Sequence, residues 1–155
     1  MKKKIPVITI LGLIVSVGLV MGLFHIWHSF TDYSRILHVN WGFTWPTAAH
    51  CSEIYQKDSG ASFQGDGIRY HVFSCKESTS IDQLFEWQSE QNETNYHDSF
   101  VDAVDDWLDE IEVPLAQRPD YNACLFWYES QADGSEIIVF WDQNKHNLYT
   151  VESFL

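Results

Sequence analysis

The amino-acid sequence predicts an α+β protein in which an N-terminal transmembrane helix precedes one folded domain. Three observations predict this class: an apolar run at residues 5–27, alternating apolar and polar residues in an early hairpin and a C-terminal three-strand meander, and helical periodicity in two segments between them. We therefore expect one antiparallel sheet, made from the hairpin and the meander, that packs on two helices.

The N-terminal segment has the length and the flanking charges of a membrane anchor. After MKKK, the run Ile5 to Trp27 (IPVITILGLIVSVGLVMGLFHIW) contains no acid, lysine or arginine, and roughly 20 apolar residues span a bilayer as a helix. The three lysines predict a cytoplasmic tail at residues 1–4 and an extracytoplasmic C-terminal part, so we expect a single-pass protein of the cell membrane. A cleaved signal peptide is the alternative. It fits less well, because the run exceeds a usual h-region and no A-x-A-like site follows it.

A juxtamembrane connector at residues 28–35 and a domain at residues 36–155 follow the predicted anchor. The start of the domain, ILHVNW at 36–41, is compatible with a first strand or with an extension of the anchor helix. All 22 acidic residues lie beyond the anchor, against six lysines and arginines, so this part carries a net charge of −16. Such a surface repels nucleic acid and attracts basic proteins or peptides. A need for solubility alone would also explain it.

Residues 50–75 are predicted to form a β-hairpin with a long loop, because CSEIYQKD and GIRYHVFSC flank the turn-rich SGASFQGDG. If the hairpin folds symmetrically about Phe63, Cys51 faces Cys75. An extracytoplasmic location favours a disulfide between them, and closing a loop of this length contributes roughly 3 kcal/mol to stability. We therefore predict the Cys51–Cys75 bridge.

The same register makes two further predictions. It pairs Ile54 with Val72 on the buried face of the hairpin, and it pairs Lys57 with Arg69, a like-charge contact that counts against it. The third cysteine, Cys124, lies in an apolar segment and is predicted to be a small buried residue rather than a nucleophile.

Two helices are predicted between the hairpin and the meander. In SIDQLFEW, Ser80 and Gln83 have the spacing of a capping box. The second helix, DSFVDAVDDWLDEIEVP, begins at Asp98 or Ser99 and is stopped by Pro114. Its apolar residues fall on one stripe of a helix: Phe100, Val104, Trp107, Leu108 and Ile111.

The opposite side of this second helix is acidic. A stripe of carboxylates there is a candidate binding surface for a cationic peptide or, weakly, for divalent ions, although a solvated helix face often has this pattern. Like charges at i and i+4 also cost some helix stability. The residues of this stripe are Asp98, Asp102, Asp105, Asp109 and Glu112.

The last third of the chain predicts three strands, NACLFWYES, EIIVFWD and NLYTVESF, joined by the tight connections QADGS and QNKH. The middle of this meander is apolar on both faces, so the face that does not pack on the helices must be covered by the hairpin, a second copy of the chain or a ligand. Trp127 and Trp141 are therefore candidate binding residues.

One motif suggests a protease and is rejected. TAAHC and DSG resemble the segments that carry the catalytic histidine and serine of chymotrypsin-like enzymes. Those enzymes bring their catalytic groups together from distant parts of two barrels, whereas His50 and Ser59 lie nine residues apart on one predicted hairpin arm. We therefore expect no serine protease.

The sequence predicts neither a metal site nor a cofactor. His71 and Cys75 lie about 13 Å apart along one strand, too far to share an ion. The loop from Asp58 does not fit an EF-hand, because Phe63 and Arg69 stand where glycine and glutamate are required.

FQGDGIRYHVF, together with the closing DQNKHNLYTVE, resembles the signatures of a family of short, uncharacterised, membrane-anchored extracytoplasmic proteins of Gram-positive bacteria. The resemblance implies a cell-envelope protein and lends no catalytic residues. Gln64 stands where the family's FHGDG-like loop has a histidine. The loop residues that we consider for a site are Asp58, Gly65, Asp66 and Gly67.

From these observations we expect a non-catalytic binding or interaction module of the cell envelope, which uses either the acidic helix or the aromatic face of the sheet. One alternative is an immunity-type protein that binds a cationic peptide through the acidic helix. Another is a small hydrolase built around the GDG loop, with Asp58, Asp66, His50 or His71 as acid–base groups.

Overall fold

The computed structural model describes residues 18, 33–60, 66–89 and 97–155, and side chains only from 101 onward in the last range. The chain divides into two compact units, Met1–Thr44 and Trp45–Leu155, which are described separately. The predicted anchor lies outside the described residues except for Gly18. In the part that is described, no helix has the length and apolar character needed to cross a membrane.

In the first unit, residues 33–41 are helical. Tyr33, Leu37 and Trp41 are buried and recur at i, i+4 and i+8, the spacing that places side chains on one helix face. The segment 36–41, which the sequence left open between strand and helix, is therefore helical.

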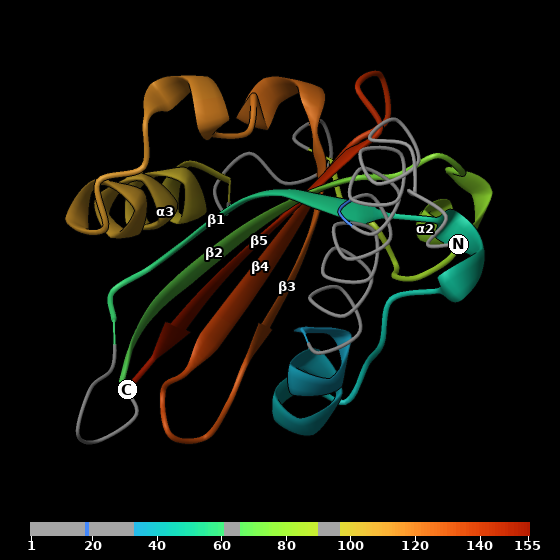
Figure 1. The fold of residues 1–155 in the computed structure, drawn as a ribbon. Helices are drawn as coiled ribbons and strands as arrows, with labels where there is room; N and C mark the ends of the chain where they lie inside the picture. Colours follow the sequence, from blue (N-terminus) through green and yellow to red (C-terminus); the bar gives the residue numbers. More distant parts are fainter. Residues whose placement is uncertain (1–17, 19–32, 61–65, 90–96) are drawn as a thin grey trace, which may run out of the picture. The chain divides into compact units, whose positions relative to one another are not determined.

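The second unit is built on a five-stranded antiparallel sheet (Figure 1), and the predicted α+β class is confirmed. The hairpin does not fold over the meander. Instead it extends the same sheet, because its second strand pairs with the last strand of the chain along eight residues. The strand order is β1-β2-β5-β4-β3, with β1 at Ser52–Asp58, β2 at Gly67–Ser74, β3 at Leu125–Ser130, β4 at Glu136–Asp142 and β5 at Asn147–Phe154.

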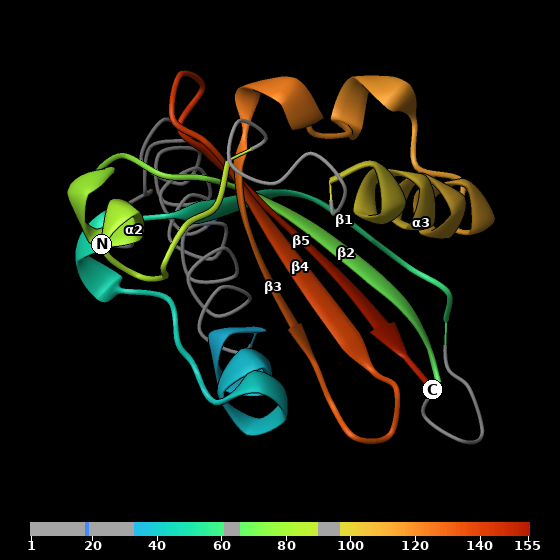
Figure 2. The same ribbon diagram turned by 180° about the vertical axis from the view of Figure 1, so that it is seen from behind.

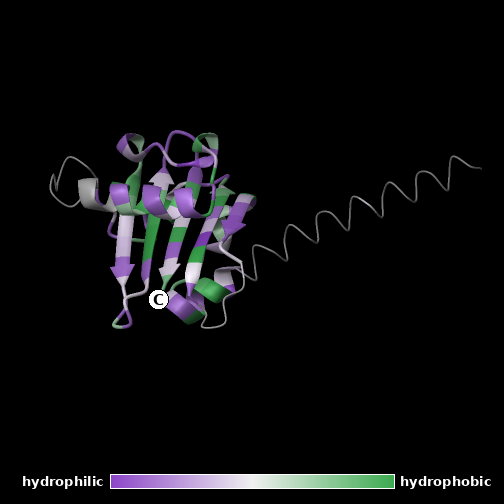
Figure 3. Cartoon of the chain, turned by 90° about the vertical axis from the view of Figure 1, so that its left-hand side faces the viewer, coloured by the Kyte–Doolittle hydropathy of each residue, from purple (hydrophilic) through white to green (hydrophobic). Residues whose placement is uncertain are grey.

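Helix α3 (His97–Glu110) covers one face of this sheet. Val104, Leu108 and Ile111 are buried in a single core with residues of β2, β3, β4 and β5, and Trp107 packs against that core. The predicted apolar stripe is confirmed for these four residues, whereas the side chain of Phe100 lies outside the described ones. Figure 3 shows hydrophobic residues concentrated on the strands and hydrophilic residues on the turns.

The other predicted helix is much shorter than expected. Helix α2 (Thr79–Asp82) lies on the opposite side of the sheet from α3 (Figure 2) and has only four residues. Its first turn is capped by the carboxylate of Glu77, which accepts hydrogen bonds from the backbone N–H groups of Thr79 and Ser80, so the predicted capping box at Ser80 is wrong.

Contacts with the sheet explain why α2 ends early. Phe85 stacks on Trp127 of β3 with 4.1 Å between ring centroids, and the backbone of Gln88 forms a β-bridge with Phe126. A continuing helix could not satisfy both contacts, so the sheet overrides the local helical pattern. The 3-10 turns of this unit are η1 (Thr47–Ala49), η2 (Leu115–Gln117) and η3 (Tyr121–Ala123).

The disulfide Cys51–Cys75 is present, as predicted, and closes the hairpin at the start of β1. Beside it the predicted register holds, since Ser52 pairs with Ser74 and Glu53 with Phe73. Cys124 is buried and is the free cysteine among the described residues.

Beyond Glu53 the predicted register is wrong by one residue, because a β-bulge at Ile54 shifts β1 along β2. Ile54 is 54% exposed, and Tyr55 replaces it opposite Val72. The shift also moves Lys57 away from its predicted partner Arg69, which now faces Asp58. An aromatic residue thereby joins the core, and an opposite-charge pair replaces a like-charge pair.

Candidate functional site

The C-terminal end of α3 has a backbone conformation that is uncommon for a residue other than glycine. The N–H of Glu112 donates to the carbonyl of Asp109 (3.0 Å), and the N–H of Val113 donates to the carbonyl of Leu108 (2.8 Å). This is a Schellman motif, in which the next-to-last residue takes the left-handed conformation and is usually glycine. Here it is Glu112, with φ of 56°, so a glutamate occupies a position that strains a side-chain-bearing residue.

Charges at this helix end also oppose the helix dipole. The carbonyl end of a helix carries a partial negative charge and favours basic residues. The last turn of α3 contains none, and Asp109, Glu110 and Glu112 cluster there instead.

Arg118 neutralises part of this acidity from a neighbouring segment. Its guanidinium donates to Asp105 and Asp109 and, through Nε and Nη2, to the carbonyl of Val113 (3.1 and 2.9 Å). Only 9% of its side chain is exposed. Tyr121 adds a hydrogen bond to Asp105 at 2.6 Å. Two carboxylates of the predicted acidic stripe are therefore bound within the domain, which the sequence analysis missed.

Glu110 and Glu112 line a shallow hollow next to the end of β1. It measures about 280 Å³, and we call it the acidic hollow; its lining residues are Lys57, Asp58, Ser59, Glu110, Ile111 and Glu112. The hollow thus brings together Asp58 from the predicted loop and Glu112 from the predicted stripe, two candidates that are 54 residues apart in the chain. Three carboxylates and one lysine face it.

The backbone at the end of β1, where the hairpin loop begins, positions Asp58 and Ser59. Asp58 accepts a hydrogen bond from the N–H of Gly60 (2.8 Å), and Ser59 exchanges hydrogen bonds with Ile68. Gly67 has φ of 139°, and a Cβ there would lie 2.2 Å from the Ser59 hydroxyl. The second glycine of the GDG turn is therefore required for this close approach.

The remaining stripe and loop candidates lie elsewhere. Asp102 is exposed on α3 and Asp66 is exposed before β2, but neither lines the acidic hollow. Gly65 and the side chain of Asp98 lie outside the described residues. Seven of the nine acidic-stripe and loop candidates are described, and among these Asp58 and Glu112 line the hollow.

The two tryptophan candidates lie far from the hollow, on the α2 side of the sheet. Trp141 is fully buried and donates its indole N–H to Asp82 at 2.8 Å. Trp127 is half-buried under Phe85. Their rings cover the sheet together with α2 and the segment that follows it.

The groups considered for acid–base chemistry do not converge. His50 precedes β1 and Asp58 ends it, so about 25 Å of extended chain separates them. His71 is paired with Glu53, with 2.6 Å between Nδ1 and Oε1. Burial, together with the nearby Asp142 and Asp120 carboxylates, raises the pKa of the Cys124 thiol to about 12, so this thiol stays protonated near neutral pH.

Arg118 and Glu110 were missed for a definable reason. Arg118 is the one lysine or arginine between Lys76 and Lys145, which is a weak signal that it pairs with the preceding acidic helix. Glu110 lies outside the i, i+4 stripe, and it lines the hollow because the end of α3 lies beside the end of β1. The chain matches no protein-family model, no curated protein and no solved structure.

Proposed function

We propose that this protein is a non-catalytic binding module of the cell envelope, held at the outer face of the membrane by the Ile5–Trp27 segment, and that the acidic hollow captures a cationic peptide or protein segment. One observation carries the proposal. Glu112 keeps a carboxylate at a left-handed position that glycine would occupy without strain, and it does so at the negative end of a helix.

Such local conflicts with stability concentrate at functional sites. Glycine at position 112 would relieve the backbone, and a base in the last turn of α3 would complement the dipole. The chain has neither, and it adds Asp58 and Glu110 around the same hollow. The excess of carboxylates over Lys57 favours a partner that brings ammonium or guanidinium groups.

A peptide is a better fit than a metal ion. Within the described ranges, no three histidine, cysteine or acidic side chains come together closely enough to hold a metal. The hollow is wide and shallow, so it suits long, flexible lysine or arginine side chains that keep part of their hydration. An immunity-type protein that neutralises a cationic peptide would use the same chemistry.

The test is titration of the full chain, in detergent micelles, with a lysine-rich peptide and with its fully acetylated form. The combined variant Asp58→Asn, Glu110→Gln, Glu112→Gln should weaken binding of the lysine peptide about threefold per carboxylate, and high salt should weaken it for the unmodified protein. The acetylated peptide should not bind.

The matched control removes three exposed acids elsewhere, by Glu86→Gln, Asp106→Asn and Glu129→Gln. It changes the net charge by the same amount as the hollow variant. If both variants lose the same affinity, net charge alone attracts the peptide and the hollow is not the site.

A further inference from the structure

The helical residues 33–41 present a second surface with its own chemistry. At 3.6 residues per turn, Arg35, Ile36, His38 and Val39 occupy one continuous arc of about 160°. All four are exposed, and Val39 and Ile36 are 76% and 39% exposed. Their arc lies opposite the buried Leu37.

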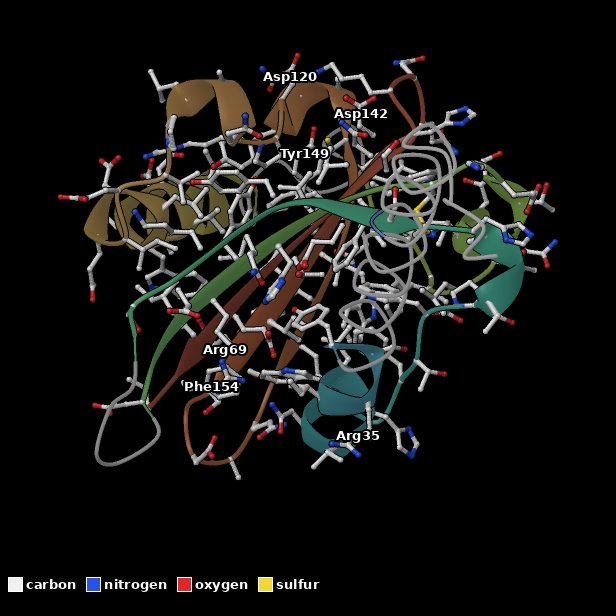
Figure 4. The ribbon with its side chains drawn as sticks, in the orientation of Figure 1. Arg35, Arg69, Asp120, Asp142, Tyr149 and Phe154 are labelled. Atoms are coloured by element: carbon white, nitrogen blue, oxygen red, sulfur yellow. A yellow bond between two sulfur atoms is a disulfide. The ribbon has the colours of Figure 1, made fainter. Side chains whose placement is uncertain are left out.

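The exposed arc is divided into two halves. Ile36 and Val39 form an apolar half, while Arg35 and His38 form a polar half that can donate hydrogen bonds. A short helix with an apolar strip beside a basic one is suited to the interface between acyl chains and headgroups. Arg35, labelled in Figure 4, is the one lysine or arginine between Trp27 and Lys57.

The position of this helix in the chain favours a lipid surface as the binding partner of the exposed arc. Six residue steps separate Trp27, the end of the apolar run, from Tyr33, so the start of the helix lies within about 20 Å of wherever that run ends. If Ile5–Trp27 spans the bilayer, the helix is confined to the headgroup region or just above it.

We infer that the arc formed by Arg35, Ile36, His38 and Val39 docks on the outer lipid surface. This inference rests on the membrane topology of the proposed function and extends it. Ile36 and Val39 enter the headgroup boundary, and Arg35 contacts anionic phosphate groups. The acidic domain is repelled by the same anionic surface.

The experiment uses the full chain reconstituted into phosphatidylcholine vesicles, with and without phosphatidylglycerol. V39C carries an environment-sensitive fluorophore, and the vesicles contain lipids with quenchers on their acyl chains. The matched control carries the same fluorophore on L115C, because Leu115 is 82% exposed in the domain. Cys124 is buried, so labelling is selective for the introduced thiol.

We expect lipid quenching and a blue-shifted emission at position 39 but not at position 115. Arg35→Gln should reduce the docked population about fivefold in the anionic vesicles, because one base near an anionic surface contributes about that factor. Ile36→Asp should abolish the quenching at position 39. Equal quenching at the two sites, or an unchanged signal in Ile36→Asp, overturns the docking.

Flotation of the same vesicles separates the two proposals. A chain that floats with the vesicles but shows no quenching at position 39 retains its anchor and refutes docking alone. A chain that does not float lacks the anchor, and that result overturns the membrane topology together with the docking.

Discussion

The two ends of the β1–β2 hairpin contrast in how they are held. At the disulfide end, Cys51–Cys75 joins the strands, and the predicted register holds. The N–H groups of Lys76 and Glu77 there both donate to the carbonyl of Ala49 (3.1 and 3.2 Å). At the loop end, beyond the Ile54 bulge, the strands meet α3 at the acidic hollow.

The difference shows how one hairpin can combine stability with an exposed charged site. Carboxylates that repel one another are tolerated at the loop end because the disulfide and the hydrophobic core hold the strands together. The charge at the loop end is only partly neutralised, by Arg118, which binds Asp105 and Asp109 of α3. Arg69 is the cross-strand backbone partner of Asp58, and its guanidinium lies 4.5 Å from the centroid of the Phe154 ring (Figure 4). Binding and folding should therefore respond differently to changes at the two ends.

The largest effect is expected from alkaline pH, which acts on the hydrophobic core that both ends share. Burial raises the pKa of Cys124 from 9.0 to about 12, and it also raises the pKa of Tyr70, Tyr121 and Tyr149. A raised folded-state pKa gives stability that is complete below the unfolded-state pKa and is lost as pH rises through the folded value. We expect unfolding between about pH 9 and pH 12. The measurement is tryptophan fluorescence and circular dichroism as a function of pH.

Cys124→Ala serves as the control for this prediction. Without the thiol, the transition should move to higher pH, because one of the groups that must ionise on unfolding is absent. A stability curve that is flat to pH 12, or a midpoint unchanged in Cys124→Ala, would contradict the role given to the buried thiol.

Removal of the disulfide should have the next largest effect. The double variant Cys51→Ala, Cys75→Ala is expected to lose roughly 3 kcal/mol in urea denaturation, because the unfolded chain regains the entropy of an open loop. Affinity for the lysine-rich peptide should persist wherever the domain remains folded. A folded variant that no longer binds would show that the two ends are coupled.

Single-residue deletions test the bulge between the two ends. Deletion of Ile54 removes the extra residue and keeps Tyr55 opposite Val72, so we expect a loss of about 1 kcal/mol or less. Deletion of Gln56 forces either Tyr55 or the charged end of the strand out of place, and burial lost at Tyr55 should cost about 2 kcal/mol. Thermal unfolding of the two deletions gives the comparison, and the reverse order would mean that the bulge itself is required.

The smallest effect is expected at Glu112, where stability and binding should move in opposite directions. Glu112→Gly relieves the left-handed conformation and should stabilise the domain by about 0.5 to 1 kcal/mol, while it weakens peptide binding. Glu112→Gln keeps the strain and should weaken binding without the gain in stability. Denaturation and peptide titration of both variants check this, and unchanged affinity in both would remove Glu112 from the site.

Local patterns in the sequence predicted the elements that depend on near neighbours. The period of α3 placed Val104, Leu108 and Ile111 in the core, alternation marked the strands, and the spacing of Cys51 and Cys75 gave the bridge. Each of these follows from the repeat of a helix or strand, because burial of an apolar face imposes that repeat on the sequence.

Other features were decided only in the folded chain. The Ile54 bulge depends on which residue faces Arg69 and Val72 across the sheet, the early end of α2 depends on Phe85 meeting Trp127, and the position of Arg118 depends on where α3 ends. The acidic hollow combines Asp58 with Glu112 for the same reason. These features arise from contacts between segments distant in the sequence, and the energies of such contacts override local propensity without leaving a periodic trace.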